Sequence, residues 1–238
     1  MNNNQGEESE KKTLNLTPEK QKSIVYFISG LGADRRMFQF LRLPEDQPHE
    51  YVHWVEPLHV DEPLPAYVKR LSEQVHHPDP ILVGLSLGGV AAIEMSKILQ
   101  PRKTIIISSL SSRYALPWYY HIMGRLRLHR YTPISLLRSL HPLAPYFFGA
   151  QTSYEKKLLK EIILSMNEKY LRWSLGQLLM WQQEKILPDL THIHGTADKV
   201  LPLRYRPDII KIQGGEHLMV MNRAEEISAI LNKILKEL

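Results

Sequence analysis

Short runs of apolar residues alternate with amphipathic segments along most of the chain. The run at 23–28 is β-branched and aromatic, and the run at 103–108 is almost continuously apolar, as in strands that are covered on both faces. Residues 63–76 place Tyr67 and Leu71 on one face of a helix. The expected strands are 23–28, 51–55, the run that begins at Ile81, 103–108, 190–194 and 208–212. This alternation of strands and helices predicts a parallel sheet with helices on both faces.

The alternation stops after the strand at 103–108. From about Ser112 to Pro188 the pattern is helical and rich in aromatic residues and prolines, with the clearest helices at 154–166 and 168–185. In an α/β fold such an insertion is expected to form a cap over the edge of the sheet where ligands bind. We therefore expect an α/β core of residues 23–112 and 189–238 and a helical cap of residues 113–188.

Composition and charge narrow the class of protein only slightly. The net charge of +5 and the pI near 9.2 are too modest to indicate a nucleic-acid partner. The chain has no cysteine, which excludes disulfides and thiol chemistry. Residues 1–22 are expected to form a disordered polar tail without the apolar core of a signal peptide. Because no apolar run is long enough to span a bilayer, we expect a cytoplasmic protein without stable membrane insertion. The oligomeric state stays open.

The stretch that follows Ile81 carries the first candidate for chemistry. A strand there enters a helix within two residues of Ser86, and such a tight bend strains the backbone of the residue at its apex. Gly84 and Gly88 supply the room that the strand end and the helix start require. This Gly-x-Ser-x-Gly pattern predicts a nucleophile elbow with the Ser86 hydroxyl at a helix N-terminus. The alternative interpretation of the pattern is an exposed serine in a glycine-rich turn.

A nucleophilic serine needs a base and a third group that orients the base. Asp198 and His217 follow the last two expected strands, so both should reach the same edge of the sheet as Ser86. In this hypothesis His217 is the general base and acid, and Asp198 orients its imidazole. The order Ser86, Asp198, His217 is the one expected for a hydrolase built on an elbow. The backbone N–H groups of Leu31 and Leu87 are the expected oxyanion donors.

The distribution of acidic residues favours Asp198 as the acid. No Asp or Glu occurs between Glu94 and Glu155, so no carboxylate can follow the strand at 103–108. Asp189 and Asp208 precede their strands and should lie at the opposite edge.

Four motifs run in a recognisable order from about residue 24 to the C-terminus. Together they resemble the α/β-hydrolase superfamily, in particular its small single-cap serine esterases and the synthase-like enzymes of the menaquinone pathway. The resemblance implies the fold, the triad and a mechanism without a cofactor. Ser29 stands where many members have histidine, and the chain before the first strand is too short for two opening strands, which implies about six strands. The motifs are Ser29-Gly30-Leu31-Gly32, Gly84-Leu85-Ser86-Leu87-Gly88-Gly89, residues 194–202 and Gly214-Gly215-Glu216-His217.

The expected cap contains candidates for a substrate pocket. We expect Trp118, Trp173, Trp181 and Arg113 to line it, although packing between cap and core explains most of the aromatic residues.

Two further patterns are candidates for binding sites. His192 and His194 alternate on one strand, but no third ligand stands at metal-binding spacing, so no metal site is expected. Arginines of the acid-free segment could recognise an anionic substrate, lie against an acidic membrane, or simply be solvated. They are Arg113, Arg125, Arg127, Arg130 and Arg138.

The residues favour a serine hydrolase that cleaves a carboxylic ester or thioester of a small acyl-containing substrate through an acyl-enzyme. Two alternatives remain. The same triad could serve a C–C hydrolase or lyase that acts on an anionic acyl substrate. The scaffold could also be a non-catalytic ligand-binding protein.

Overall fold

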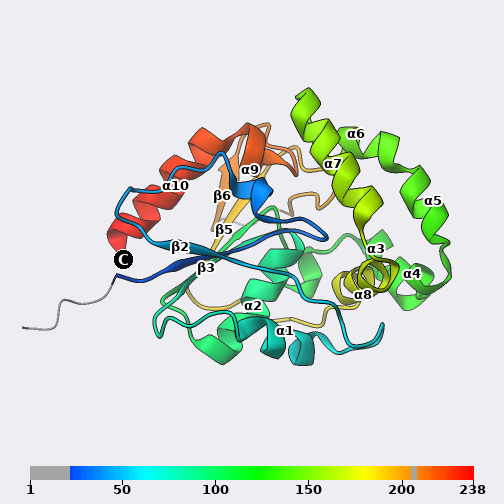
Figure 1. Cartoon of the computed structure of the whole chain (residues 1–238), viewed down its shortest axis with the longest axis horizontal. Helices are drawn as coiled ribbons and strands as arrows, with labels where there is room; N and C mark the ends of the chain where they lie inside the picture. Colours follow the sequence, from blue (N-terminus) through cyan, green and yellow to red (C-terminus); the bar gives the residue numbers. More distant parts are fainter. Residues whose placement is uncertain (1–21, 205–207) are drawn as a thin grey trace, which may run out of the picture.

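Six strands form one parallel sheet. The computed structural model of the chain describes residues 22–204 and 208–238 (Figure 1). The order across the sheet is β2-β1-β3-β4-β5-β6, and every neighbouring pair is parallel. The predicted parallel sheet is thus confirmed, while the predicted tail lies, except for Lys22, outside the described residues. The strands are β1 (Val25–Ile28), β2 (His49–Val52), β3 (Ile81–Leu85), β4 (Lys103–Ile107), β5 (Leu190–Gly195) and β6 (Ile209–Ile212).

Helices cover both faces of the sheet. Figure 1 shows α10 (Ala224–Glu237) on one face and α1 (Leu64–Ser72) and α2 (Leu87–Leu99) on the other. Every residue of α2 from Leu87 to Met95 is buried, because this helix packs against β3, β4 and α1. The strands are correspondingly apolar on both sides, with Ile105, Ile106 and Ile107 of β4 fully buried.

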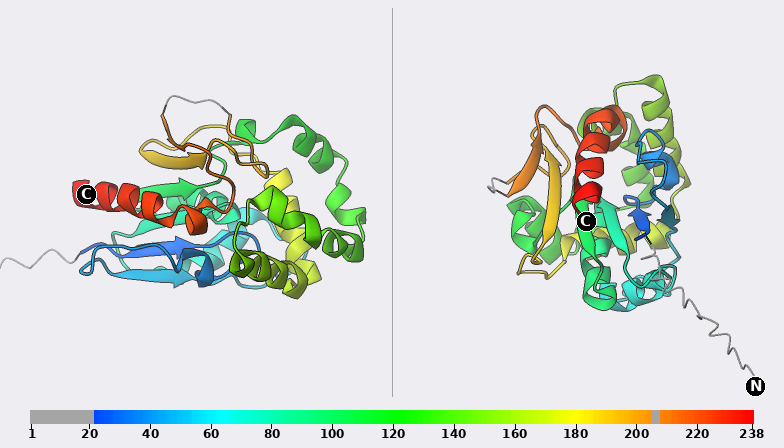
Figure 2. Two further views of the ribbon diagram at one scale, coloured as in Figure 1. Left: turned by 90° about the horizontal axis from the view of Figure 1, so that it is seen from above. Right: turned by 90° about the vertical axis from the view of Figure 1, so that its left-hand side faces the viewer.

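Helices α3 to α8 lie between β4 and β5 in the chain and occupy the end of the molecule away from the C-terminus (Figures 1 and 2). We call residues 113–188 the helical insertion. Within the residues that the structure describes, no helix is both long and apolar enough to cross a membrane. The helices are α3 (Trp118–Arg125), α4 (Leu128–Tyr131), α5 (Ile134–Ser139), α6 (Ala144–Phe148), α7 (Ser153–Ser165) and α8 (Glu168–Leu179); short 3₁₀ turns are η1 (Arg35–Phe38), η2 (Arg113–Ala115) and η3 (His141–Leu143), and α9 is Met219–Asn222.

Two predicted elements differ from the observed ones. The helix expected at 168–185 ends at Leu179, and the strand expected at 51–55 is β2, which ends at Val52. After β2, Trp54 turns toward the loop that follows β1 and donates a hydrogen bond from Nε1 to the Gly30 carbonyl at 3.0 Å. A tertiary contact of this kind has no signature in local hydrophobic periodicity.

A single residue, Ser86, connects β3 to α2. Ser86 has φ +52°, a left-handed conformation that costs about 1–3 kcal/mol for a non-glycine residue. The strand and helix also approach so closely that side chains are excluded. A Cβ at Gly84 would lie 2.3 Å from the Gly88 carbonyl oxygen, and one at Gly88 would lie 2.2 Å from the Ile28 carbonyl oxygen. The two glycines of the predicted elbow are therefore required by the close packing of β3, α2 and β1.

We expect Gly88→Ala to lower the free energy of unfolding by about 1–3 kcal/mol, because the added methyl group meets backbone oxygens that cannot move aside. Urea unfolding followed by circular dichroism measures the change. Gly30→Ala is the matched control, because its Cβ would find no atom closer than 3.4 Å. The control should shift the free energy by less than about 1 kcal/mol. Equal effects of the two variants would contradict this explanation.

Candidate active site

The structure brings Ser86, His217 and Asp198 into one hydrogen-bonded chain at the carboxyl edge of the sheet. The Ser86 hydroxyl lies 3.0 Å from His217 Nε2, and His217 Nδ1 lies 2.8 Å from Asp198 Oδ2. Asp198 and His217 are each only 4% exposed, whereas Ser86 is partly accessible. The carboxylate only accepts, so Nδ1 of His217 carries the proton and Nε2 is left to accept from the hydroxyl. Such an arrangement can let a serine hydroxyl act as a nucleophile, with the imidazole as its base and the carboxylate as the group that orients the imidazole.

The environment of Asp198 keeps it ionised. Burial by itself raises the pKa of a carboxyl group, but the interaction with His217 and the hydrogen bond from the Leu201 N–H outweigh it, so the pKa of Asp198 lies below its usual value. Oδ1 accepts from the backbone N–H groups of Val200 at 2.9 Å and Leu201 at 2.8 Å. Oδ2 is thereby aimed at His217.

Hydrogen bonds from β4 and from Ser109, just beyond it, hold the strained turn at Ser86. The Ser86 N–H donates to the Ile107 carbonyl at 2.9 Å, and the Ser109 hydroxyl donates to the Ser86 carbonyl at 2.6 Å. Ser109 was not singled out from the sequence. Its position two residues beyond β4, beside the elbow in the neighbouring strand, is the signal that could have identified it.

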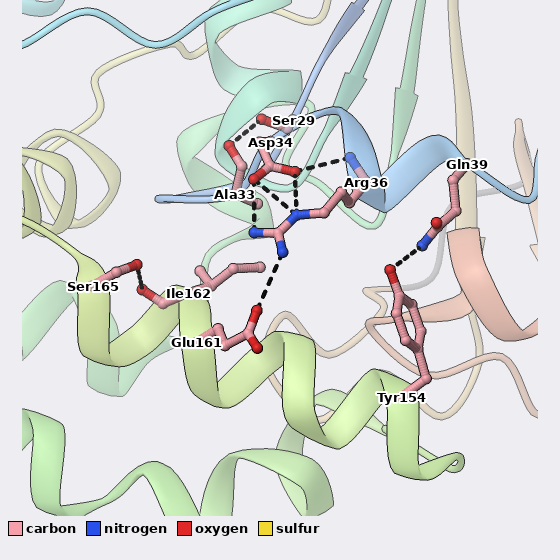
Figure 3. Close-up of polar contacts among 9 residues, drawn as sticks. All are labelled: Ser29, Ala33, Asp34, Arg36, Gln39, Tyr154, Glu161, Ile162 and Ser165. Carbon is pink, nitrogen blue, oxygen red and sulfur yellow. Dashed lines mark hydrogen bonds and ion pairs between the residues drawn. The ribbon is translucent and has the colours of Figure 1, made fainter.

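The glycine-rich loop after β1 lies directly against Ser86. A Cβ at Gly30 would be 3.4 Å from the Ser86 Cβ. Ser29, the residue that departs from the family pattern, donates from its hydroxyl to the Ala33 carbonyl at 2.6 Å (Figure 3) and accepts from Trp54 Nε1 at 3.1 Å. It therefore stabilises the loop from within. Leu31 and Leu87 both lie beside Ser86 at the same cavity, and their role as oxyanion donors stays a prediction.

The same loop is tied to the helical insertion. Figure 3 shows the Arg36 guanidinium between Asp34 at the start of the 3₁₀ turn and Glu161 on α7, with ion-pair distances of 2.9 and 3.2 Å. Gln39 Nε2 also donates to the Tyr154 hydroxyl at 2.8 Å. On the opposite side of the site, the Tyr120 hydroxyl donates to the Val200 carbonyl at 3.0 Å. The insertion is thus joined to two of the loops that form the site.

A cavity of about 600 Å³ lies between Ser86 and the helical insertion. Ser86 and His217 form part of its wall, and side chains from α3 to α8 form most of the rest. Most of these side chains are leucine, isoleucine, methionine or aromatic residues. The volume is within the range of about 300–1,000 Å³ found for small-molecule sites.

None of the four predicted pocket residues is among those that line this cavity, so this part of the prediction is wrong. Trp173 is fully buried, and its Nε1 donates to the Glu62 carbonyl at 2.8 Å. Trp181 is also buried and donates from Nε1 to Glu94 Oε1 at 2.8 Å. Two residues lie outside the packed interior. Trp118 is 67% exposed, and Arg113 donates to Gln182 Oε1 at 2.7 Å.

His192 and His194 form a buried pair beside Asp198. His194 Nε2 lies 2.8 Å from the Leu201 carbonyl and 3.5 Å from Asp198 Oδ2, so this nitrogen carries the proton. Burial lowers the pKa of His194 by more than the nearby Asp198 carboxylate raises it, so His194 is neutral. Its Nδ1 then carries no proton and accepts a hydrogen bond from His192 Nε2 at 2.9 Å. In the described parts of the chain, no group of three or more His, Asp or Glu side chains has the geometry of a metal site.

Comparison with known proteins supports the same architecture. No protein-family model matches the chain, and no curated protein sequence matches it. A candidate lipase from Acinetobacter baumannii has a similar structure, with a TM-score of 0.71, 12% identity, and coverage of 92% of this chain and 85% of that one. An esterase from Exiguobacterium antarcticum gives a TM-score of 0.64, 16% identity, and coverage of 90% and 92%. A thermophilic esterase from Thermogutta terrifontis gives a TM-score of 0.61 at 15% identity, with coverage of 91% of this chain and 90% of that one.

The sheet order, the position of the elbow and these structural similarities define the fold. The chain has the α/β-hydrolase fold.

The neutral state of His194 makes stability depend on pH. In the unfolded chain this histidine takes up a proton below pH of about 6.5, whereas burial disfavours the proton in the folded chain. The free energy of unfolding should therefore fall as the pH drops from 6.5, by at most about 1.4 kcal/mol per pH unit from this group. Asp198 adds to the loss only at more acidic pH, because its usual pKa is already low.

Urea unfolding between pH 7.5 and 5.5 checks this expectation. His194→Gln should make the decline shallower, since the glutamine amide can still donate to the Leu201 carbonyl but binds no proton. His53→Gln, at an exposed histidine, is the control and should leave the decline unchanged. A decline of the same steepness in all three proteins would show that His194 does not cause it.

Proposed function

We propose that this protein is a serine hydrolase that cleaves a carboxylic ester or thioester of an apolar acyl group. The observation that carries the proposal is the hydrogen-bonded chain from Ser86 through His217 to Asp198 at the wall of an apolar cavity. The similar structures with ester-cleaving names agree with this class of reaction.

Each group has a defined part in the reaction. As the Ser86 hydroxyl attacks the acyl carbon, His217 Nε2 takes its proton, and the imidazolium that forms is stabilised by Asp198. The oxyanion of the tetrahedral intermediate is met by the N–H groups of Leu87 and Leu31. His217 then returns the proton to the leaving alcohol or thiol, and an acyl-enzyme remains on Ser86. Water, activated by His217 in the same way, releases the acid.

The cavity favours an apolar acyl group over a polar one. Its wall is mostly aliphatic and aromatic, and a chain that enters it removes apolar surface from water. Ser86 and His217 are at the wall, so an ester bond there places the acyl chain among the insertion's side chains.

One observation favours the alternative of an anionic acyl substrate. Arg138 lines the cavity, its Nη2 donates to the Met166 carbonyl at 2.8 Å, and its buried Nε has no hydrogen-bond partner in the part of the chain described. A carboxylate on the substrate would satisfy this donor. Under this alternative, the protein would bind anionic acyl compounds and would not hydrolyse neutral esters.

Ser86→Ala should reduce kcat for hydrolysis of a p-nitrophenyl ester by on the order of 10⁶, as removal of a triad serine does in other hydrolases. A fluorophosphonate probe should label the native chain and fail to label the variant. Ser96→Ala, a partly buried serine of α2 outside the site, is the control and should keep both properties. A folded native chain that binds acyl compounds without labelling or turnover would identify a non-catalytic binding protein.

Activity on p-nitrophenyl esters should rise with acyl length. Burial of each methylene contributes about 0.8 kcal/mol, so kcat/KM should increase about fourfold per added carbon until the cavity is filled. Leu175→Trp adds bulk to the cavity wall, so it should lower kcat/KM for the longest esters and leave kcat/KM for the acetate ester unchanged. Leu164→Trp adds the same bulk at an exposed position of α7 and should leave kcat/KM unchanged for both the longest esters and the acetate ester. A preference for acetate in the native chain would contradict an acyl-binding role for the cavity.

A further inference from the structure

The helical insertion exposes much of the apolar surface of the molecule. More than half of the large hydrophobic side chains exposed in residues 22–204 and 208–238 lie within residues 118–147. We call this set the apolar face. Large exposed apolar patches on proteins mark sites where a ligand, another protein or a membrane binds. The members are Trp118, Tyr119, Ile122, Met123, Leu126, Leu128, Tyr131, Leu136, Leu140, Leu143, Tyr146 and Phe147.

Half of the apolar face borders the cavity beside Ser86. These side chains are exposed and at the same time line the cavity that contains Ser86, so they connect its interior with the surface. They come from α3, α4, α6 and the segment around η3, which together form the end of the molecule away from the C-terminus (Figures 1 and 2). The cavity-lining members are Tyr119, Met123, Leu128, Leu140, Leu143 and Phe147.

The charge of this region has one sign. Residues 118–147 contain four arginines and no Asp or Glu. Arg130 pairs with Asp61, which lies outside the insertion, and Arg138 is bonded to a backbone carbonyl. Arg125 and Arg127 are both exposed and flank Leu126, which is 58% exposed. Cationic and apolar side chains therefore alternate along this exposed segment.

We propose that the apolar face docks on the surface of a bilayer that contains anionic lipid. Tryptophan and tyrosine rings prefer the boundary between head groups and acyl chains, and leucine side chains beside them can enter the acyl region. The arginines would meet anionic head groups at the same depth. A protein partner is less well matched, because protein interfaces have a mixed polar rim. Within residues 118–147, by contrast, the only charged side chains are the four arginines.

Docking in this orientation turns the mouth of the cavity toward the bilayer. An apolar acyl chain could then pass from lipid to the vicinity of Ser86 without crossing water, and this consequence rests on the proposed function. The docking itself does not require catalysis, so the two can fail separately.

Co-sedimentation of the full-length chain with vesicles tests the proposal. The chain should partition into vesicles of equal parts phosphatidylglycerol and phosphatidylcholine, bind pure phosphatidylcholine much more weakly, and be released by salt. The double variant Arg125→Gln/Arg127→Gln should weaken partition about 30-fold, which is about fivefold for each arginine. Lys233→Gln/Lys236→Gln removes the same charge from exposed positions of α10 and should weaken it less than twofold.

Leu126→Ser/Tyr131→Ser tests the apolar contribution and should also reduce partition. None of these positions lines the cavity or is buried, and an unchanged thermal unfolding midpoint verifies that each variant is folded. Ser86→Ala should bind vesicles as well as the native chain, which separates this test from the proposed hydrolysis.

Several results would overturn the proposal. They are absence of binding to anionic vesicles at low salt, equal binding to pure phosphatidylcholine, and equal losses in the α10 and α3–α4 charge variants. Self-association that Leu126→Ser/Tyr131→Ser abolishes, without vesicle binding, would instead assign the face to a second copy of the chain. Binding of an acidic protein in place of vesicles would overturn it in the same way.

Discussion

The strained backbone at Ser86 is the constraint on which the site depends. A left-handed conformation at a serine persists only when its surroundings over-determine it, and here three elements contribute. Ile107 of β4 and Ser109 just beyond it bond to the two backbone groups of Ser86. Carbonyl oxygens at the end of β1 lie close to Gly88, and α2 begins at Leu87, directly after Ser86. The hydroxyl is consequently held at the sheet edge before any substrate arrives. Such preorganisation is what nucleophilic catalysis requires.

The remaining groups reach that edge because the sheet is parallel. Asp198 and His217 leave β5 and β6 in the same direction in which Ser86 leaves β3, so residues far apart in the chain meet within hydrogen-bond distance. The helical insertion closes over them through contacts with the same loops. The Leu218 N–H donates to the Phe148 carbonyl at 2.8 Å, and the Phe148 ring lies edge-on to His217 with centroids 5.2 Å apart.

The apolar side chains of the insertion lie in three places: the interior, the cavity wall and the surface. Trp173 and Trp181 pack inside and satisfy their indole N–H groups on Glu62 and Glu94. A second group lines the cavity beside Ser86, and a third lies on the surface. Because residues 95 to 154 contain no Asp or Glu, the charged side chains that this segment itself contributes are all cationic. The proposed acyl site and the proposed lipid-binding face would both follow from this composition. Both depend on apolar side chains of the insertion that are not buried in the core.

The sequence by itself determined the sheet, the elbow and the meeting of Ser86, Asp198 and His217. These depend on short-range patterns, namely buried strands, glycines with no room for a side chain, and the rule that parallel strands end at one edge. Only the tertiary structure decided which residues hold the site in place and which residues line the cavity. Ser109 and His194 act through neighbouring strands, and Trp118, Trp173, Trp181 and Arg113 all lie away from the cavity. Local pattern cannot assign such residues, because a helical side chain faces core, cavity or solvent according to how its helix packs against others.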